Sequence, residues 1–170
     1  MEFKEVIRNR YSCKKYSDRK VEEEKLLAIL EAGRLAPTAK NAQEQRTYVL
    51  QSKEALEKLD QITPCRYGAP VVLMVGFNRD ETFTYPGGKY SAGSEDATIV
   101  ATHMILSAED EGLNSCWINM FDPDVARETF GLPENIEIVM LMDLGYAAED
   151  AKPSPRHLER RSVAQAVEVL

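Results

Sequence analysis

Two clusters of cationic side chains, one near each end of the chain, are the residues whose types suggest chemistry. Residues 1–20 hold seven Lys/Arg against three Asp/Glu, and residues 152–161 hold four against one, so together they carry +7. The whole chain carries −7, which leaves −14 on the other 140 residues. Guanidinium and ammonium groups contributed from both ends could hold a small anionic ligand. For either cluster alone, a solvated helix face is the alternative explanation.

The overall composition argues against several other classes of function. A nucleic-acid-binding protein normally presents a basic face on a neutral or basic domain, whereas this chain has an isoelectric point near 5.0. No apolar run approaches the roughly 18 residues of a membrane-spanning helix. The N-terminus, MEFKEVIRNR, is charged where a secretory signal needs an apolar segment. We therefore expect a cytoplasmic protein with no membrane or nucleic-acid partner.

The chain lacks the common motifs of nucleotide and hydrolytic sites. No GxGxxG follows a predicted strand, and the GGK at 87–89 lacks both the upstream glycine and the following Ser/Thr of a P-loop. The three widely spaced cysteines form no CxxC pair, so they are expected to be small buried hydrophobes rather than metal ligands. His103 and His157 are the only histidines in the chain, so few residues could serve as the base of a catalytic triad. We expect no metal and no catalytic side chain, and an enzyme of this kind would need a bound cofactor to supply the reactive atom.

The elements that must position the cationic residues can be predicted from the hydrophobic periodicity. The most regular pattern recurs every three or four residues from Ala97 to Ala108, before Gly112, and predicts a core helix. Further helices are predicted over 3–9, 22–35, 53–61 with Ser52 as its cap, and 123–131 after Asp122. Strands are predicted over 47–51, 69–78, 114–120 and 136–146. No repeat or composition shift divides the chain, so residues 1–170 are expected to form one α+β domain.

Four segments, in this order along the chain, resemble the signature motifs of the nitroreductase family of FMN-dependent oxidoreductases. They are RYSCKKY at 10–16, LAPTAKNAQ at 35–43, WINMF at 117–121 and LGY at 144–146 before the basic tail. The resemblance covers nearly the full length of the chain. It implies the fold of that family, with a central mixed sheet of about four or five strands flanked by helices and FMN bound at a homodimer interface.

The resemblance also implies roles for residues of the first motif. Arg10 and Ser12, with Tyr11 between them, would bind the FMN phosphate, since Arg offers a planar fork of donors and Ser a hydroxyl. Lys14 would lie nearer the N1 and C2 carbonyl edge of the flavin ring. A fixed cation there would stabilise the negative charge that reduction brings to this edge, and would raise the reduction potential. Tyr11 and Lys14 differ from the residues more frequent in the family.

The remaining motifs are implied to complete the cofactor site. Contacts from the partner subunit would come from Pro37, Thr38, Ala39 and Asn41. The backbone of Asn119 and Met120 would approach the flavin near N5. In the C-terminal tail, Arg160 or Arg161 is preferred over Arg156 as the residue that closes on the phosphate. The 97–108 helix resembles the central dimer helix of the family, although burial within one chain explains its pattern equally well.

The chemistry implied by the resemblance is a ping-pong reaction. NAD(P)H would give hydride to flavin N5 and leave, and an electron-poor small-molecule acceptor would then be reduced in the same place. Nitroaromatics, quinones, flavins and enones are all candidate acceptors. The loop at 82–94 is either a lid over the substrate or an ordinary surface loop. A non-catalytic flavin- or nucleotide-binding module that uses the same phosphate cluster is the alternative function.

Overall fold

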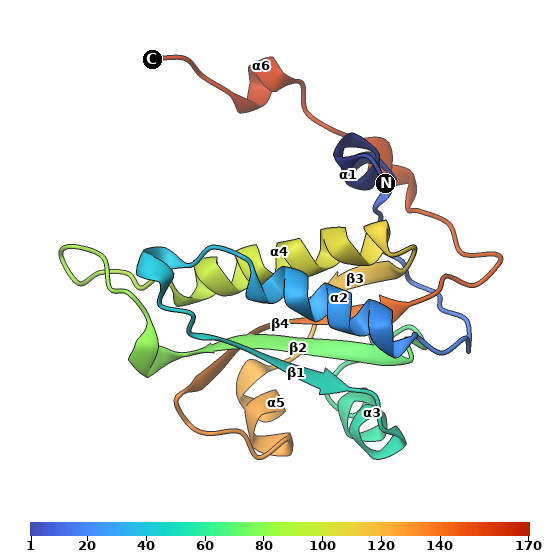
Figure 1. Ribbon diagram of the computed structural model, residues 1–170, viewed down its shortest axis with the longest axis horizontal. Coiled ribbons are helices and arrows are strands. Elements are labelled where there is room, and N and C mark those ends of the chain that lie inside the picture. Colours follow the sequence, from blue (N-terminus) through green and yellow to red (C-terminus); the bar gives the residue numbers. More distant parts are fainter.

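A four-stranded sheet forms the centre of the computed structural model, which describes residues 1–170 (Figure 1). In the order of the sheet, the strands are β1 (Gln45–Leu50), β2 (Val71–Asn78), β4 (Ile136–Gly145) and β3 (Asn114–Ile118). The observed architecture is therefore α+β, as predicted, and each bound of the predicted strands lies within two residues of the observed one.

The direction of the strands corrects one expectation. All neighbouring strands pair antiparallel, so the sheet is not mixed. β2 and β3 do run parallel to each other, but β4 lies between them and pairs antiparallel with both. Apolar runs buried on both faces occur in either kind of sheet, so the sequence pattern could not give the direction. The parallel pairing that exists is an isolated bridge between Ser12 and Ser115.

Helices cover both faces of the sheet, with α2 and α4 on one side and α3 and α5 on the other (Figure 1). The α-helices are α1 (Phe3–Asn9), α2 (Glu23–Arg34), α3 (Lys53–Asp60), α4 (Gly93–Asp110), α5 (Pro123–Thr129) and α6 (Val163–Ala166). Three short 3₁₀ helices were not predicted: η1 (Ala39–Asn41), η2 (Arg79–Glu81) and η3 (Pro155–Leu158). The predicted caps are confirmed, because Ser52 accepts from the Ala55 N–H and Asp122 from the Asp124 N–H.

The apolar stripe of α4 is buried against the sheet and α2. All six of its predicted members are at most 8% exposed and belong to one core cluster: Ala97, Val100, Ala101, Met104, Ile105 and Ala108. Gly33 on α2 permits the close approach of the two helices, since a Cβ there would lie 2.8 Å from the Met104 side chain. Burial within one chain therefore accounts for the stripe, while Ile99 on another face of α4 is 38% exposed.

The C-terminal tail extends away from the sheet and its helices, beyond η3 (Figure 1). Its apolar side chains have little cover, and Leu158, Val163 and Val169 are 85%, 78% and 92% exposed. No helix of the structure has both the length and the apolar composition that a membrane span requires.

Candidate functional site

A cationic cleft forms where the two ends of the chain meet, as the charge distribution predicts. The cleft has a volume of about 300 Å³. It is lined by Arg10, Tyr11, Ser12, Lys14, Cys116, Ser154, Arg156, His157 and Arg160. Four of these side chains are cationic and none is acidic. An anion that enters the cleft therefore meets positive charge from both chain ends and no carboxylate.

The N-terminal side of the cleft, residues 10–16, is an extended segment docked beside β3. After α1 ends, the Cys13 N–H donates to the Ser115 carbonyl over 3.0 Å, and Ser12 pairs with Ser115 as an isolated bridge. Successive side chains of an extended chain point to opposite faces. Cys13 is accordingly buried, whereas Ser12 and Lys14 face outward into the cleft. The backbone pairing thus fixes which side chains of the RYSCKKY motif are available to a ligand.

The C-terminal side of the cleft is built by η3 and the residues around it. The Ser154 side chain accepts from the Arg156 N–H and opens η3. His157 packs edge-on against Tyr11, with ring centroids 6.4 Å apart. Arg160 donates to the Glu159 carbonyl over 2.7 Å, which orders its guanidinium.

The tail arginines do not all occupy the cleft. Arg156 and Arg160 line it, whereas Arg161 lines a separate groove formed by tail residues. Sequence reasoning preferred Arg160 or Arg161 and gave no role to Ser154, His157 or Cys116. The SPRH run, in which proline starts a 3₁₀ turn after a serine cap, is the signal that could have pointed to Ser154 and His157.

Two titratable groups of the cleft, Tyr11 and Cys116, remain neutral near pH 7. Burial, followed by the charge of Cys13, raises the pKa of Tyr11 to about 12. Burial and the nearby Asp143 raise the pKa of the Cys116 thiol to about 11, and the Lys14 ammonium lowers it only in part. Neither group therefore adds negative charge beside the two N-terminal and two C-terminal cations of the cleft.

A buried acid lies behind the cleft, on the strand next to Cys116. Asp143 on β4 pairs in register with Cys116 on β3 and is 1% exposed. Its Oδ2 has no hydrogen-bond partner, and the nearby Tyr16 hydroxyl has none either. Burial raises the pKa of Asp143 to about 9, against a smaller opposite effect of the Arg66 guanidinium. Asp143 is therefore a neutral acid at pH 7.

We expect Asp143→Asn to remove part of the pH dependence of stability. In wild type the unfolded chain loses this proton near pH 3.9, whereas the folded chain keeps it to about 9. Between these values the free energy of unfolding should fall by up to ~1.4 kcal/mol per pH unit, because only the folded state retains the proton. Asparagine has no such proton. Urea unfolding from pH 5 to 8.5 should show a flatter slope for the variant, and parallel curves would contradict the assignment.

The 37–43 loop, which contains the second motif, lies elsewhere in the fold. Its residues Lys40, Asn41 and Gln43 have φ values of 52°, 56° and 54°, a backbone region that costs non-glycine residues about 1–3 kcal/mol each. The loop is fixed by several hydrogen bonds. The Ala39 N–H donates to Asp96 Oδ2 on α4 over 2.9 Å, and the Gln43 N–H donates to Thr38 Oγ1 over 3.1 Å.

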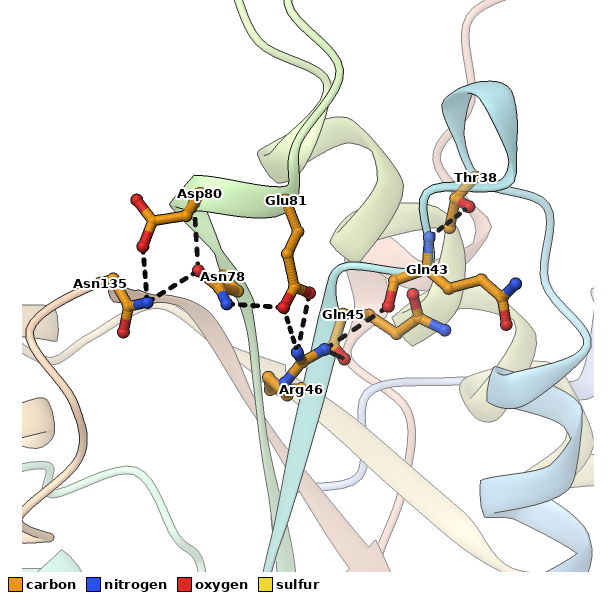
Figure 2. A network of polar contacts seen from close by, with 8 residues as sticks. All are labelled: Thr38, Gln43, Gln45, Arg46, Asn78, Asp80, Glu81 and Asn135. Atoms are coloured by element: carbon orange, nitrogen blue, oxygen red, sulfur yellow. Dashed lines mark hydrogen bonds and ion pairs between the residues drawn. The ribbon is translucent and has the colours of Figure 1, made fainter.

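A polar network also holds the outer side of the 37–43 loop (Figure 2). Arg46 Nη1 donates to the Gln43 and Gln45 carbonyls, and its Nη2 donates to both carboxylate oxygens of Glu81. Glu81 also accepts from Asn78, which connects the loop to η2. The 37–43 loop is therefore a segment of strained backbone that hydrogen bonds hold on both sides.

The structure separates the 37–43 loop from the cationic cleft. The loop contacts the first turn of α4 through Asp96, whereas the chain N-terminus next to α1 pairs with Asp110 in the last turn. The 18 residues of α4 span about 27 Å at 1.5 Å per residue. Within one chain, the exposed Pro37 and Asn41 therefore do not reach the cleft residues.

The third motif, residues 117–121, spans the end of β3 and the residues that follow it. The Asn119 side chain is held on both sides, because it accepts from the Trp117 indole N–H and donates to the Val139 carbonyl over 3.1 Å. Met120 is 67% exposed. Asn119 follows Ser115, the residue paired with Ser12, by four residues. At about 3.3 Å per residue, Asn119 therefore lies about 13 Å from Ser115 along the strand direction.

Residues 82–94 include a hairpin rather than an irregular loop. Thr84 bridges Ser91, and the Tyr85 N–H donates to the Tyr90 carbonyl over 2.9 Å. The Lys40 ammonium lies 4.4 Å from the centroid of the Phe83 ring, so the hairpin is adjacent to the 37–43 loop.

A larger groove of about 890 Å³ lies beside α3. Its lining mixes cations such as Lys20 and Lys53 with the acids Glu57 and Asp60. It contains none of the predicted site residues, and Arg66 within it is already paired with Asp60. The smaller cationic cleft is therefore the candidate site.

Comparison with known proteins places these features in a family. The model of the Nitroreductase family matches residues 7–67 and 63–146. The chain is 38% identical to a nitroreductase family protein of known structure from Clostridium difficile 630, with a TM-score of 0.92 and 99% of this chain and 98% of that chain covered. A Methanothermobacter thermautotrophicus protein, provisionally named NADH dehydrogenase/NAD(P)H nitroreductase, is 29% identical over 94% of this chain and 88% of its own length. A structure from Exiguobacterium sibiricum 255-15 that contains FMN shares the fold, at 19% identity, a TM-score of 0.86, and 100% and 98% coverage.

Proposed function

This chain belongs to the nitroreductase family, and we propose that it is an FMN-dependent oxidoreductase that passes hydride from NAD(P)H to an electron-poor acceptor by a ping-pong reaction. The family relatives bear oxidoreductase names, and the E. sibiricum structure of the same fold contains FMN. Bound FMN would supply N5 as the hydride-accepting atom. The acceptor is proposed only as a class of small molecules: nitroaromatics, quinones, flavins or enones.

The observation that carries this proposal is the cationic cleft. A flavin phosphate is a dianion, and the cleft offers four cations with no acid among its lining residues. Arg10 and Ser12 are proposed to bind the phosphate from the N-terminal side, and Arg156 or Arg160 from the tail. Tyr11 and His157 pack together and would connect the two sides around it.

Lys14 is proposed to stand at the ring end of the cleft. Its side chain is exposed, and its ammonium lies 5.8 Å from the Tyr67 ring centroid. The charge of this ammonium lowers the pKa of the buried Cys116 thiol in part. It forms no ion pair within the chain, so its charge is available to a ligand. A positive charge there would stabilise electron density gained by the N1 and C2 edge of a flavin.

We propose that the working protein is a homodimer in which the partner subunit supplies Pro37, Thr38, Ala39 and Asn41. The separation of about 27 Å along α4 supports this arrangement, because one chain alone leaves the two groups of site residues apart. Exposed apolar side chains on the tail, such as Val163 and Val169, also favour association. The backbone at Asn119 and Met120 is proposed to lie near N5, and the 82–94 hairpin near the bound acceptor.

The visible absorption spectrum tests this function directly. After FMN is added and the excess removed, the protein should retain a flavin spectrum that bleaches anaerobically with NADH, NADPH or both. Retained flavin that neither nicotinamide bleaches would indicate a non-catalytic binding module. If no flavin is retained, the cleft is not a flavin site.

A further inference from the structure

Two acidic side chains are buried together beneath the 37–43 loop. Glu44, which directly follows the loop, is 0% exposed, and Asp96 on α4 is 3% exposed. Neither carboxyl oxygen of Glu44 is paired with an N–H or O–H donor, although the Asp96 carboxyl lies within hydrogen-bonding reach. Two ionised carboxylates can only repel each other, whereas one protonated and one ionised carboxyl form a strong hydrogen bond.

The surroundings favour a proton on Glu44. Burial raises the pKa of Glu44. The dipole of its own backbone N–H opposes this rise, whereas the adjacent Asp96 carboxyl and Glu81 at the end of η2 add to it. The nearest cation on the same strand is Arg46, and its guanidinium is engaged with both carboxylate oxygens of Glu81 (Figure 2). No cation is among the charged groups that act on the Glu44 carboxyl, so an ionised Glu44 would be uncompensated.

Asp96 connects this pair to the strained part of the loop. Its Oδ2 accepts the Ala39 N–H over 2.9 Å, next to Lys40 and Asn41 with their left-handed φ values. A hydrogen bond from Glu44 would hold the Asp96 carboxyl in the orientation that accepts from Ala39. The inner anchor of the loop then depends on one shared proton, while the Arg46 and Glu81 pair anchors its outer side.

We propose that Glu44 is a positioning residue, whose protonated side chain donates to Asp96 so that Asp96 can hold the Ala39 N–H and fix the 37–43 loop in its cofactor-binding conformation. The cofactor part of this inference rests on the proposed function. When the shared proton is lost at higher pH, the two carboxylates repel, the inner anchor fails and the loop is released. FMN affinity should therefore fall as the pH rises.

Hydrogen exchange of the Ala39 amide, followed by NMR on the flavin-free protein from pH 6 to 9, tests the pair. After correction for the intrinsic exchange rate, wild-type protection should fall at least tenfold with rising pH. Glu44→Gln should keep high protection throughout, because its amide donates to Asp96 without titrating. Glu57→Gln, an exposed change on α3, should behave as wild type. Equal pH dependence in wild type and Glu44→Gln would overturn the proposal.

An infrared measurement of the protonation of Glu44 uses only the wild-type protein, so it tests the proposal even if a variant fails to fold. With isotope-labelled glutamate, the carbonyl band of one neutral glutamic acid should persist above the pH at which the exposed glutamates ionise, and should disappear as the pH rises further. Loss of this band together with those of the exposed glutamates would overturn the proposal.

FMN titration of the same proteins separates this inference from the proposed function. Between pH 6.5 and 9, wild type should lose at least tenfold more affinity than Glu44→Gln, and parallel losses would overturn the positioning role. Failure to bind FMN at any pH would contradict the proposed function and the cofactor role of the loop, while amide exchange would still report on the pair.

Discussion

Arg10→Ala is expected to weaken FMN binding by about 10- to 150-fold, which corresponds to about 1.5–3 kcal/mol for a charge-assisted hydrogen bond. The Arg10 side chain lines the cationic cleft and forms no ion pair within the chain, so its donors are free for a phosphate. The Arg10 charge lowers the pKa of Glu109 on α4, although burial raises that pKa overall. Quenching of FMN fluorescence on titration with the protein gives the dissociation constant.

Arg8→Ala is the matched control for Arg10. Arg8 lies in the last turn of α1, is exposed and does not line the cleft. Its removal changes the net charge by the same amount, so it should leave the dissociation constant within about twofold if contact rather than overall charge matters. The flavin-free forms of both variants should unfold at the wild-type temperature. An Arg10→Ala protein that binds FMN as tightly as wild type would remove Arg10 from the site.

Lys14→Met is expected to lower the reduction potential of the bound flavin by about 30–60 mV. This range corresponds to the loss of about 1.5–3 kcal/mol of stabilisation in a two-electron couple. The sign follows from charge, because a cation beside the ring favours the form that has gained electrons. Anaerobic titration against a redox dye of known potential measures the shift without reference to any acceptor.

Lys15→Met separates the local effect from a general loss of charge. Lys15 is the next residue, but its ammonium pairs with Asp150 and it does not line the cleft. Its removal should leave the potential within about 10 mV of wild type, since an exposed paired charge contributes little at a distance. Equal shifts in the two variants would place Lys14 away from the flavin ring.

The local elements could be predicted from the sequence because their causes are local. The helix at 3–9 has the observed bounds of α1, and the caps at Ser52 and Asp122 depend on hydrogen bonds within three residues. The alternation in RYSCKKY likewise determines that Ser12 and Lys14 share one face of an extended segment. The direction of the strands was not predictable, because it depends on β4 lying between β2 and β3.

Some features of the candidate site could likewise be predicted from the sequence, and others could not. Charge counting alone indicated that both chain ends could hold one anion, and the structure places them in one cleft. Which of Arg156, Arg160 and Arg161 line the cleft depends on the direction in which η3 points each side chain. The sequence of a tail interrupted by prolines does not predict that direction. The distance between the 37–43 loop and the cleft could not be predicted from the sequence either, because the length and placement of α4 set that distance.

Composition and motif order by themselves indicated the family, a cluster of cations suited to an anionic ligand, and the main helices and strands of this protein. Tertiary structure decided which acids are buried with raised pKa values. Among 28 Asp and Glu residues, Glu44 and Asp143 have no distinguishing sequence pattern. They stand apart only because folding removes water from them and places no cation in contact, and desolvation is a property of the packed neighbours rather than of the residue.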